Sequence, residues 1–494
     1  MSELYPKPAD LPLAQEDWDA LPEQVQRIFG AYALVQQARL DAQQDRLEAL
    51  DERVRELEAR LRQDSSNSSK PPSSDPPWKD KLKEKRKRQR GKRRRGAQEG
   101  HEGSRRETIP RERVTSVDEH RPESCEHCNK SLAGASMVEG NHRRQVIEIP
   151  PIEPLVFEHR VFGAMCSCGH ETWASFPAEA MYGSGPRLTA LTAQLSGRYR
   201  LSRQETADLL SEVLSVPICK GTVQACCERV SDALAEPVDE VASALPDQDV
   251  VHVGETGWKV AGKRAWLWVF SSATIAYFAI DPRRGRGILE RLFPDGHPGT
   301  VNSDRWSAYS YFSAMRRQLC WSHMLRDLQG IVDAKGPGSG PAEPVLQAAE
   351  KMFADWHALR RGEITRAELT ERIAPFRVSL CIFAEAGVSQ KKDSKWRGLG
   401  RDLIRYQPAV FRFVEVEGVE PTNNQAERDI RPAVLWRRAT QGTRSEKGCL
   451  FASRMLTAAA TCRRQGHRLL DYLERAVLAH QLGEQPPSLI TLAR

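Results

Sequence analysis

Hydrophobic residues recur every seven positions near the start of the chain. The repeating series is Leu40, Leu47, Val54 and Leu61. Two more leucines, Leu50 and Leu57, each follow a member of this series by three positions. Gln, Asp, Glu and Arg fill most of the positions between them. This spacing is typical of the apolar seam of a coiled coil, so it predicts an amphipathic helix over residues 33–63 that binds a second helix. The alternative is a solvated helix that packs on its own chain.

A strand-like pattern of short apolar runs separated by turns occupies residues 248–306 and continues shortly beyond them. The elements expected in chain order are strands at 249–253, 264–272 and 275–281, a helix at 287–293, a strand at 300–303, a helix at 306–312 and a strand at 318–323. Three strands, a helix and another strand are the order of an RNase H-like α/β sheet, which is the fold that we expect here.

Helical patterns precede this sheet. In residues 186–235, Ser202 and Glu205 form a capping-box pattern, and Pro217 separates two helices. Two helices joined by a turn fit a helix-turn-helix-like DNA-binding region. Two packed helices without a role in DNA binding are the alternative.

Helical patterns also follow the sheet. Residues 333–420 are mostly helical and interrupt the α/β pattern, so we interpret them as an insertion. Residues 421–439 predict a helix capped by Asn or Thr, and residues 450–482 predict a further amphipathic helical region.

These patterns predict a multidomain protein of α and β structure. The expected parts are an N-terminal region with a coiled coil (1–63), a disordered Ser/Pro linker and basic segment (64–104), a small zinc-binding module (105–180), a helical DNA-binding region (181–245), an RNase H-like catalytic domain (246–332 and 421–445), its helical insertion (333–420) and C-terminal helices (446–494). A chain of 494 residues is long enough for several such parts.

Charge is distributed unevenly along the chain. The formal net charge is +7, but residues 79–95 alone hold twelve Lys and Arg against two acids. The other 61 basic and 64 acidic residues carry −3. Such a segment predicts binding to DNA phosphates without sequence preference, and a solvated tail is the alternative. The residues expected to contact DNA are Lys85, Arg86, Lys87, Arg88, Arg90, Lys92, Arg93, Arg94 and Arg95.

Several classes of protein are not indicated by the sequence. No apolar run approaches the roughly 18 residues of a membrane-spanning helix, so no membrane partner is expected. The N-terminal residues lack the basic and apolar regions of a signal peptide. Eleven cysteines spread over a long chain favour a reducing compartment over a disulfide framework, and we expect a cytoplasmic protein.

Four cysteines form two close pairs, Cys125 with Cys128 and Cys166 with Cys168. Thiolates on two turns suit a tetrahedral Zn²⁺ site. The second pair has the shorter C-x-C spacing, and the alternatives for one ligand are His127, His142 and His170. Four reduced cysteines without a metal are the alternative to the whole site. Residues 145–165 alternate in polarity and predict strands for this module.

Two acidic residues have positions that suit metal chemistry. Asp304 closes a short strand, and Glu427 lies in the first turn of a helix that begins with two asparagines. Carboxylates from distant segments hold divalent metal ions in enzymes that displace phosphoryl groups. Position alone is also typical of ordinary surface acids.

A resemblance gives these positions more meaning. The strings that carry it, together with the cysteine pairs, are SSNSSKPPSSD at 65–75, GETGWKVAGKRAWLWV at 254–269, NSDRWSAY at 302–309, CWSHMLRDL at 320–328 and PTNNQAERDIRP at 421–432. In this order they resemble the large transposase subunit of the insertion-sequence-sixty-six family over roughly residues 35–485.

The resemblance implies an RNase H-like domain with a helical insertion before its last acid. It also implies a catalytic Asp-Asp-Glu set that holds Mg²⁺ or Mn²⁺, in which Asp304 matches the second Asp and Glu427 matches the Glu. The implied reaction is cleavage of the element's ends followed by strand transfer. The implied partners are DNA, as terminal repeats and as target, a second copy of the chain in a homo-oligomer, and accessory proteins of the same element.

The first acid of that set is missing here. The family's Asp-Glu-Thr string reads Gly254-Glu255-Thr256 in this sequence. Glu255 is no substitute, because the family also has Glu at its place and because strand side chains alternate between faces. We therefore expect an impaired transposase. The alternative is an inactive DNA-binding protein that binds the element's ends and regulates or competes with an active copy. An unrelated RNase H-like nuclease explains neither the N-terminal strings nor the cysteine pairs.

Other residues near these acids are candidates for contacts with DNA. Arg428 and Arg431 follow Glu427 on the same helix and are expected to contact phosphates, with plain surface charge as the alternative. Arg437 and Arg438 are expected in a basic rim, and His323 either lines the site or makes a buried hydrogen bond. Three tryptophans are expected in the core where they face inward, and an exposed one is suited to stacking on a base: Trp258, Trp266 and Trp268.

Overall fold

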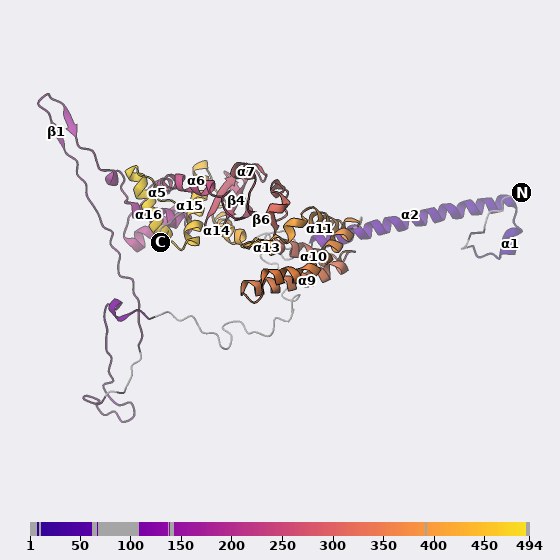
Figure 1. Ribbon diagram of the computed structural model, residues 1–494, viewed down its shortest axis with the longest axis horizontal. Helices are drawn as coiled ribbons and strands as arrows, with labels where there is room; N and C mark the ends of the chain where they lie inside the picture. The colour runs from indigo at the N-terminus through magenta and orange to yellow at the C-terminus, as the bar shows by residue number, and fades with distance from the viewer. Residues whose placement is uncertain are drawn as a thin grey trace. The chain divides into compact units, whose positions relative to one another are not determined.

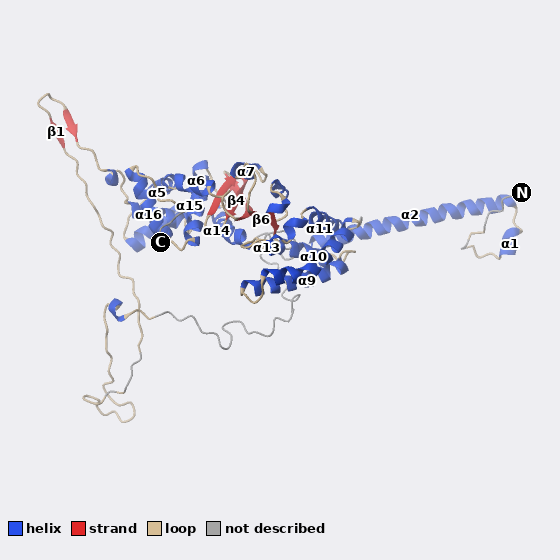
Figure 2. Ribbon diagram, viewed as in Figure 1, coloured by secondary structure: helices blue, strands red, loops and turns tan. Residues whose placement is uncertain are grey.

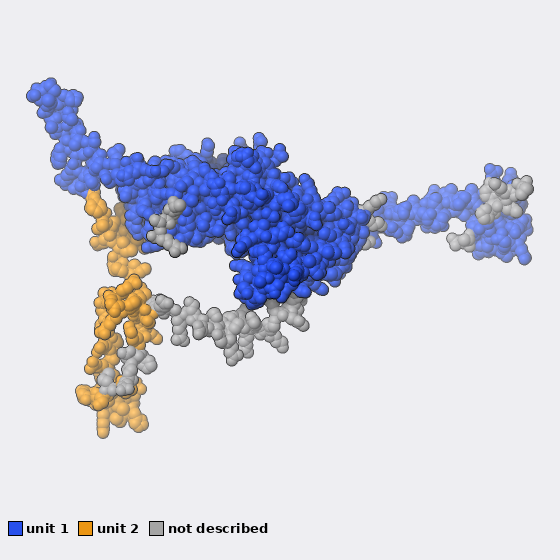
Figure 3. Space-filling model, viewed as in Figure 1, with its two compact units in different colours: residues 1–76, 158–207, 219–494 blue, residues 77–157, 208–218 orange. Residues whose placement is uncertain are grey.

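The computed structural model describes residues 7–8, 11–61, 67, 108–136, 138, 143–390 and 393–490. The basic segment at 79–95, His142 and most of the 65–75 string lie outside the described residues. The chain divides into two compact units, shown in separate colours in Figure 3. One contains residues 1–76, 158–207 and 219–494, and the other contains residues 77–157 and 208–218.

A long helix dominates the N-terminal part of the chain (Figure 1). The short helix α1 (Gln15–Asp19) precedes α2 (Glu23–Leu61), which has 39 residues. The Gln26 side chain ties the two together by donating hydrogen bonds to the carbonyl oxygens of Trp18 at 2.7 Å and Leu21 at 3.1 Å. The helix predicted for residues 33–63 is confirmed as far as Leu61, and it begins ten residues earlier. Its apolar seam is exposed, with Leu47 60% exposed.

A five-stranded mixed sheet lies at the centre of the larger unit (Figure 2). Its strands are β3 (Val250–Val260), β4 (Lys263–Ser271), β5 (Ala276–Asp281), β6 (Thr300–Ser303) and β7 (Arg317–Leu319). The spatial order is β5-β4-β3-β6-β7. The first three strands pair antiparallel, whereas β6 runs parallel to β3 and to β7. The predicted order of strands is confirmed, and β3 extends well beyond the expected residue 253.

The edge strand β5 is covered by a helix, α15 (Glu446–Arg464). The hydroxyl of Thr461 accepts a hydrogen bond from the Ala276 backbone N–H at 3.1 Å, and that of Thr457 accepts one from the Phe278 N–H at 3.0 Å. The two threonines are four residues apart and so lie on one face of the helix. Their hydroxyls satisfy donors that would otherwise offer an open edge to another strand.

Helices surround the sheet and form a second core. Around the sheet lie α3 (Pro186–Gly197), α5 (Lys220–Ala233), α6 (Ala235–Ser243), α7 (Gly287–Leu292), α14 (Asn424–Thr440), α15 and α16 (Leu469–Leu482). The second core joins α8 (Trp321–Asp333), α9 (Ser339–Arg360), α10 (Arg366–Val388), α11 (Ser394–Arg405), α12 (Gln407–Val410) and α13 (Arg412–Glu415). None of the described helices has the length and apolar character to cross a lipid bilayer.

Two strand predictions are wrong. Residues 145–162 form no described strand, and only β1 (Gly163–Met165) pairs with β2 (Glu171–Trp173). Most apolar side chains in this stretch are exposed, and Pro150, Pro151 and Pro154 remove the backbone donors that a ladder needs. The strand predicted for residues 318–323 is also too long. It ends at Leu319, and residues 321–323 belong to the helix α8, which begins at Trp321.

The capping box predicted ahead of α4 (Arg203–Leu214) is present. The Ser202 backbone N–H donates to Glu205 Oε2 at 2.8 Å, and the Glu205 N–H donates to Ser202 Oγ at 3.1 Å. The helix ends before Pro217, as predicted. Its use in binding DNA stays a prediction.

Candidate active site

The parallel pairing of β3 with β6 aligns residue 254, which lies within β3, with Asp304, which directly follows β6. His252 pairs with Asn302, so Gly254 and Asp304 each lie two residues further along adjacent strands. Side chains at equivalent positions of neighbouring strands project to the same face. Residue 254 and Asp304 therefore lie next to each other on the same face of the sheet, where β6 ends.

The start of α14 is bonded directly to these strands. Asn423 donates from its side-chain Nδ2 to the Val253 carbonyl oxygen at 2.6 Å, and its Oδ1 accepts from His252 Nδ1 at 3.1 Å. Asn302 donates from its side chain to the carbonyl oxygens of Glu420 at 2.7 Å and Thr422 at 3.1 Å. Asn423 is the residue before the helix, but its side chain does not cap it. The predicted capping bond is thus replaced by a bond to β3.

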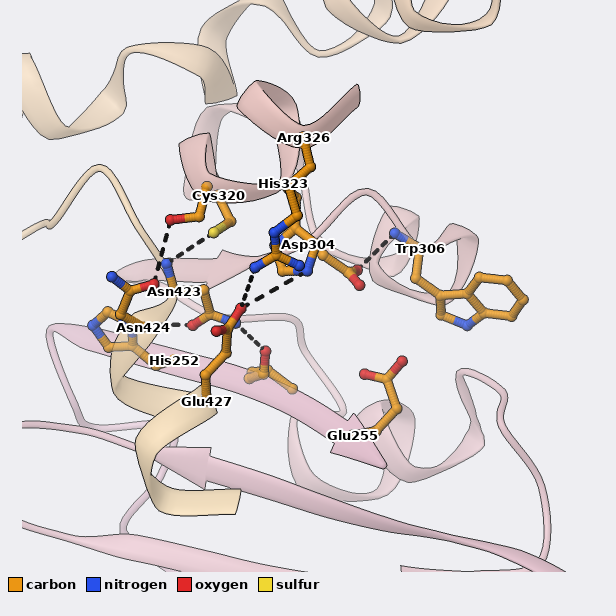
Figure 4. A network of polar contacts seen from close by, with 12 residues as sticks. His252, Glu255, Asp304, Trp306, Cys320, His323, Arg326, Asn423, Asn424 and Glu427 are labelled. Atoms are coloured by element: carbon orange, nitrogen blue, oxygen red, sulfur yellow. Dashed lines mark hydrogen bonds and ion pairs between the residues drawn. The ribbon is translucent and has the colours of Figure 1, made fainter. Parts of the chain in front are cut away.

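These bonds place Glu427, in the first turn of α14, beside two cationic residues of α8 (Figure 4). His323 Nε2 lies 3.8 Å from Glu427 Oε1, and Arg326 donates to the same oxygen at 3.5 Å. Asp304 accepts a hydrogen bond from the Trp306 backbone N–H at 2.8 Å. The Glu427 side chain is 45% exposed, so the carboxylate remains open to a ligand.

His323 is a largely buried group that lies 3.8 Å from Glu427 and is affected by the charge of Asp304. Burial by itself lowers the pKa of His323, but the neighbouring Cys320 sulfur and the Asp304 carboxylate raise that pKa to about 9. The same pairing lowers the pKa of the Cys320 thiol against the opposing effect of its burial. His323 therefore carries positive charge at neutral pH and lies within the electrostatic reach of Asp304 and Glu427.

The third position of the set faces α14. A Cβ atom built on Gly254 would lie 3.3 Å from the Cβ of Ala426 and 3.7 Å from Val269 Cγ1. Ala426 directly precedes Glu427. A side chain at 254 would therefore point to the first turn of α14. Among the described residues, no group of three or more His, Cys, Asp or Glu side chains is arranged to hold a metal ion.

Glu255 belongs to a different cluster from Gly254. Its buried carboxylate accepts hydrogen bonds from Arg284 Nε at 2.9 Å and Nη2 at 2.6 Å, and from the Tyr309 hydroxyl. Burial and the nearby Asp304 charge raise the pKa of Glu255, while Tyr309 and Arg284 oppose that rise. Glu255 is thus committed to protein partners.

The predicted arginines divide into two groups. Arg428, Arg431 and Arg438 are exposed along α14. Arg437 instead turns inward, where its Nη1 donates to the Thr256 hydroxyl at 3.3 Å and to the Gly257 carbonyl oxygen. Arg437 is thus half-buried, and its place in a basic rim along the DNA stays a prediction. Trp258 and Trp268 are in the core as predicted, and Trp266 is partly buried.

Each cysteine pair lies on a tight turn that favours thiolates. In one unit, backbone N–H groups of Cys128 and His127 lower the pKa of Cys125. In the other, the backbone N–H and thiol of Cys168 lower the pKa of Cys166. None of these four cysteines forms a disulfide. A shared zinc site stays a prediction.

Sequence reasoning missed three residues of the site. Arg326 contacts Glu427, and Tyr309 and Arg284 hold Glu255. Arg326 and Tyr309 lie inside the strings at 320–328 and 302–309, which was the available signal. Arg284 lies in a turn after β5 and carries no such signal.

Comparisons with known proteins find similarity over several parts of the chain. A family model described as "Transposase IS66 family" matches residues 184–450, which include β3 to β7 and α14. A model described as a family of unknown function (DUF6444) matches residues 19–107. The uncharacterized protein y4qI of Sinorhizobium fredii (strain NBRC 101917 / NGR234) is 22% identical over 277 residues, covering 51% of this chain and 50% of that protein. The chain thus spans about half the length of this relative.

Proposed function

Because the chain belongs to the IS66 transposase family, we propose that it binds the DNA ends of an insertion sequence, cleaves them and transfers them to target DNA. The observation that carries this proposal is the adjacent position of residue 254 and Asp304 on β3 and at the end of β6, together with the bond from Asn423 that joins the helix bearing Glu427 to β3. The mixed order β5-β4-β3-β6-β7 supports an RNase H-like catalytic domain.

The side chains of Asp304 and Glu427 have donor atoms that suit a divalent metal ion. Both offer carboxylate oxygens, which Mg²⁺ and Mn²⁺ prefer, and Glu427 is partly exposed. Such a metal, when bound, activates the attacking oxygen and stabilises the leaving oxygen of a phosphodiester. Gly254 offers no side-chain ligand. We therefore propose that only two carboxylates, instead of three, hold the metal and that cleavage and strand transfer are impaired.

The protein's own residues would orient these two acids. The Trp306 N–H holds one oxygen of Asp304, while His323 and Arg326 offset the charge of Glu427. Arg428 and Arg431 lie exposed on the same helix as Glu427 and would contact DNA phosphates near the active site. The basic segment at 79–95 would add affinity that depends on salt but not on base sequence.

The second candidate function is binding of the element's ends without cleavage. The specific observation that favours it is Gly254, since loss of a carboxylate weakens metal binding without removing the exposed arginines. Such a protein would regulate or compete with an active copy.

Linear DNA carrying both ends of the encoding element separates the two functions. Strand cleavage and joining would be measured with Mg²⁺ and with Mn²⁺, and end binding would be measured on the same DNA with chelator. Slow, metal-dependent cleavage supports the impaired transposase. Tight, sequence-selective binding without cleavage supports the regulator. Absence of both overturns both proposals. Asp304→Asn and Glu427→Gln are the matched variants, since each keeps side-chain shape and removes charge.

We also propose that α2 pairs in parallel with α2 of a second copy. Leu47 and Val54 are core positions of the seven-residue repeat. On one side of this core, the residue before each core position is an arginine, Arg46 or Arg53. On the other side, the residue four positions after each core position is an acid, Asp51 or Glu58. In a parallel, in-register pair, each of these arginines faces an acid five residues further along the other copy. An antiparallel pair would bring arginines opposite one another.

A further inference from the structure

We propose that the indole of Trp306 is a stacking site for an unpaired nucleobase of the DNA substrate, next to the phosphodiester held at Asp304. This inference rests on the proposed function, because it takes DNA as the ligand. It adds a base-binding site to the acids and arginines already described.

Trp306 is a rigid aromatic surface built at the surface of the protein. One side of its ring is occupied by Arg284, whose guanidinium carbon lies 3.9 Å from the ring centre. The same guanidinium lies 4.7 Å from the ring centre of Trp266, so it is stacked between two indoles. Trp306 itself remains 37% exposed. Part of the indole is therefore accessible from outside, and the proposal takes the face opposite Arg284 as the one on which a base stacks.

The arginine behind the indole is fixed in place. Arg284 donates twice to Glu255, whose side chain is only 3% exposed and is also held by Tyr309. An ordered support reduces the conformational entropy that the indole must lose when a base stacks on it. The buried carboxylate of Glu255 thus orients Arg284 against the indole of Trp306.

The indole is also close to the candidate chemistry. The Trp306 backbone N–H holds Asp304, and the ring projects on the side of Asp304 away from Glu427 (Figure 4). A DNA strand whose phosphate lies at Asp304 would bring a neighbouring nucleotide to the indole. Enzymes that act inside duplex DNA often take a base out of the stack, and aromatic side chains are the usual acceptors of such a base.

The test compares binding, in the presence of chelator, to three probes. They are a blunt duplex, the same duplex with a short adenosine overhang, and that duplex with an abasic overhang. In the unmodified protein the adenosine overhang should bind more tightly than the abasic one. Trp306→Leu should weaken binding to the adenosine overhang by about 5- to 150-fold and leave the other two probes unchanged. Trp306→Phe should retain most of the preference, because it keeps an aromatic face.

Trp173→Leu is the matched control, since Trp173 is also exposed and lies on β2. The melting temperature of each variant reports whether it folds. Equal loss on all three probes, or no preference for the adenosine overhang in the unmodified protein, would overturn the stacking site. This test measures DNA binding and needs no cleavage, so it can detect the stacking site even if the protein does not cut DNA. Failure of the stacking site likewise leaves the cleavage assay unaffected.

Discussion

Asn423 donates a hydrogen bond from its side chain to the carbonyl oxygen of Val253 at 2.6 Å, and this bond joins α14 to β3. Val253 precedes Gly254, and Asn423 lies one turn before Glu427. The bond therefore sets the distance between the first and last positions of the acidic set. His252 completes the contact by donating to the same amide.

Replacing Asn423 should weaken the attachment of α14 to β3. Asn423→Ala leaves the Val253 carbonyl and the His252 ring without their buried partner, which should lower the free energy of unfolding by about 1–3 kcal/mol. Urea denaturation measures the change. Asn424→Ala is the control, because Asn424 accepts one longer bond from Ser322 at 3.3 Å. Equal effects of the two variants would argue against a special role for the Asn423 bond.

His252 should make stability depend on pH. Burial lowers the pKa of His252 from 6.5 to about 4, although its bond to Asn423 opposes this shift. Between these values the unfolded chain binds a proton that the folded chain does not. The free energy of unfolding should therefore fall as the pH drops from about 6.5 towards 4, by up to about 3 kcal/mol from this residue.

Thermal melts across this pH range check the prediction. His252→Gln should flatten the dependence, whereas His357→Gln, at an exposed position of α9, should not. An unchanged slope in the His252 variant would contradict the prediction.

Restoring an acid at position 254 should raise activity. Gly254→Asp places a carboxylate at the first turn of α14 and requires the Ala426 contact to give by a few tenths of an ångström. If cleavage is limited by the missing ligand, the rate should rise on the order of 10³-fold. Cleavage of the element's ends is the measurement. Gly254→Asn has nearly the same shape without the charge, so equal rates for the Asp and Asn variants would refute the ligand explanation.

The orientation of α2 can be tested through its charges. R46E places two acids opposite each other in a parallel pair, at two symmetry-related sites. The dissociation constant of the dimer should rise by about 2- to 30-fold. Adding D51R to R46E should restore it, because each new pair is again of opposite charge. Sedimentation equilibrium gives the constants. Failure of the double variant to recover would point to another orientation.

Local patterns account for what the sequence predicted correctly. The seven-residue repeat in α2 and the capping box of Ser202 and Glu205 depend on residues within one or two helical turns. The strands of the sheet follow from short apolar runs and the turn at Ala261 and Gly262. Asp304 and Glu427 were identified by their places in matched strings, and Gly254 by its departure from one. Such signals need no knowledge of which segments meet.

The tertiary structure alone decided how those residues work together. Asn423 and Val253 are 170 positions apart, and the sequence suggested only that Asn423 would cap its own helix. The stretch at 145–162 alternates like a strand but has no described strand beside it, and a strand needs a neighbour to receive its hydrogen bonds. Trp306 and Arg284 likewise meet only because the chain folds. Hydrogen bonds and stacking act over a few ångströms, so partners distant in sequence are fixed by packing rather than by local pattern.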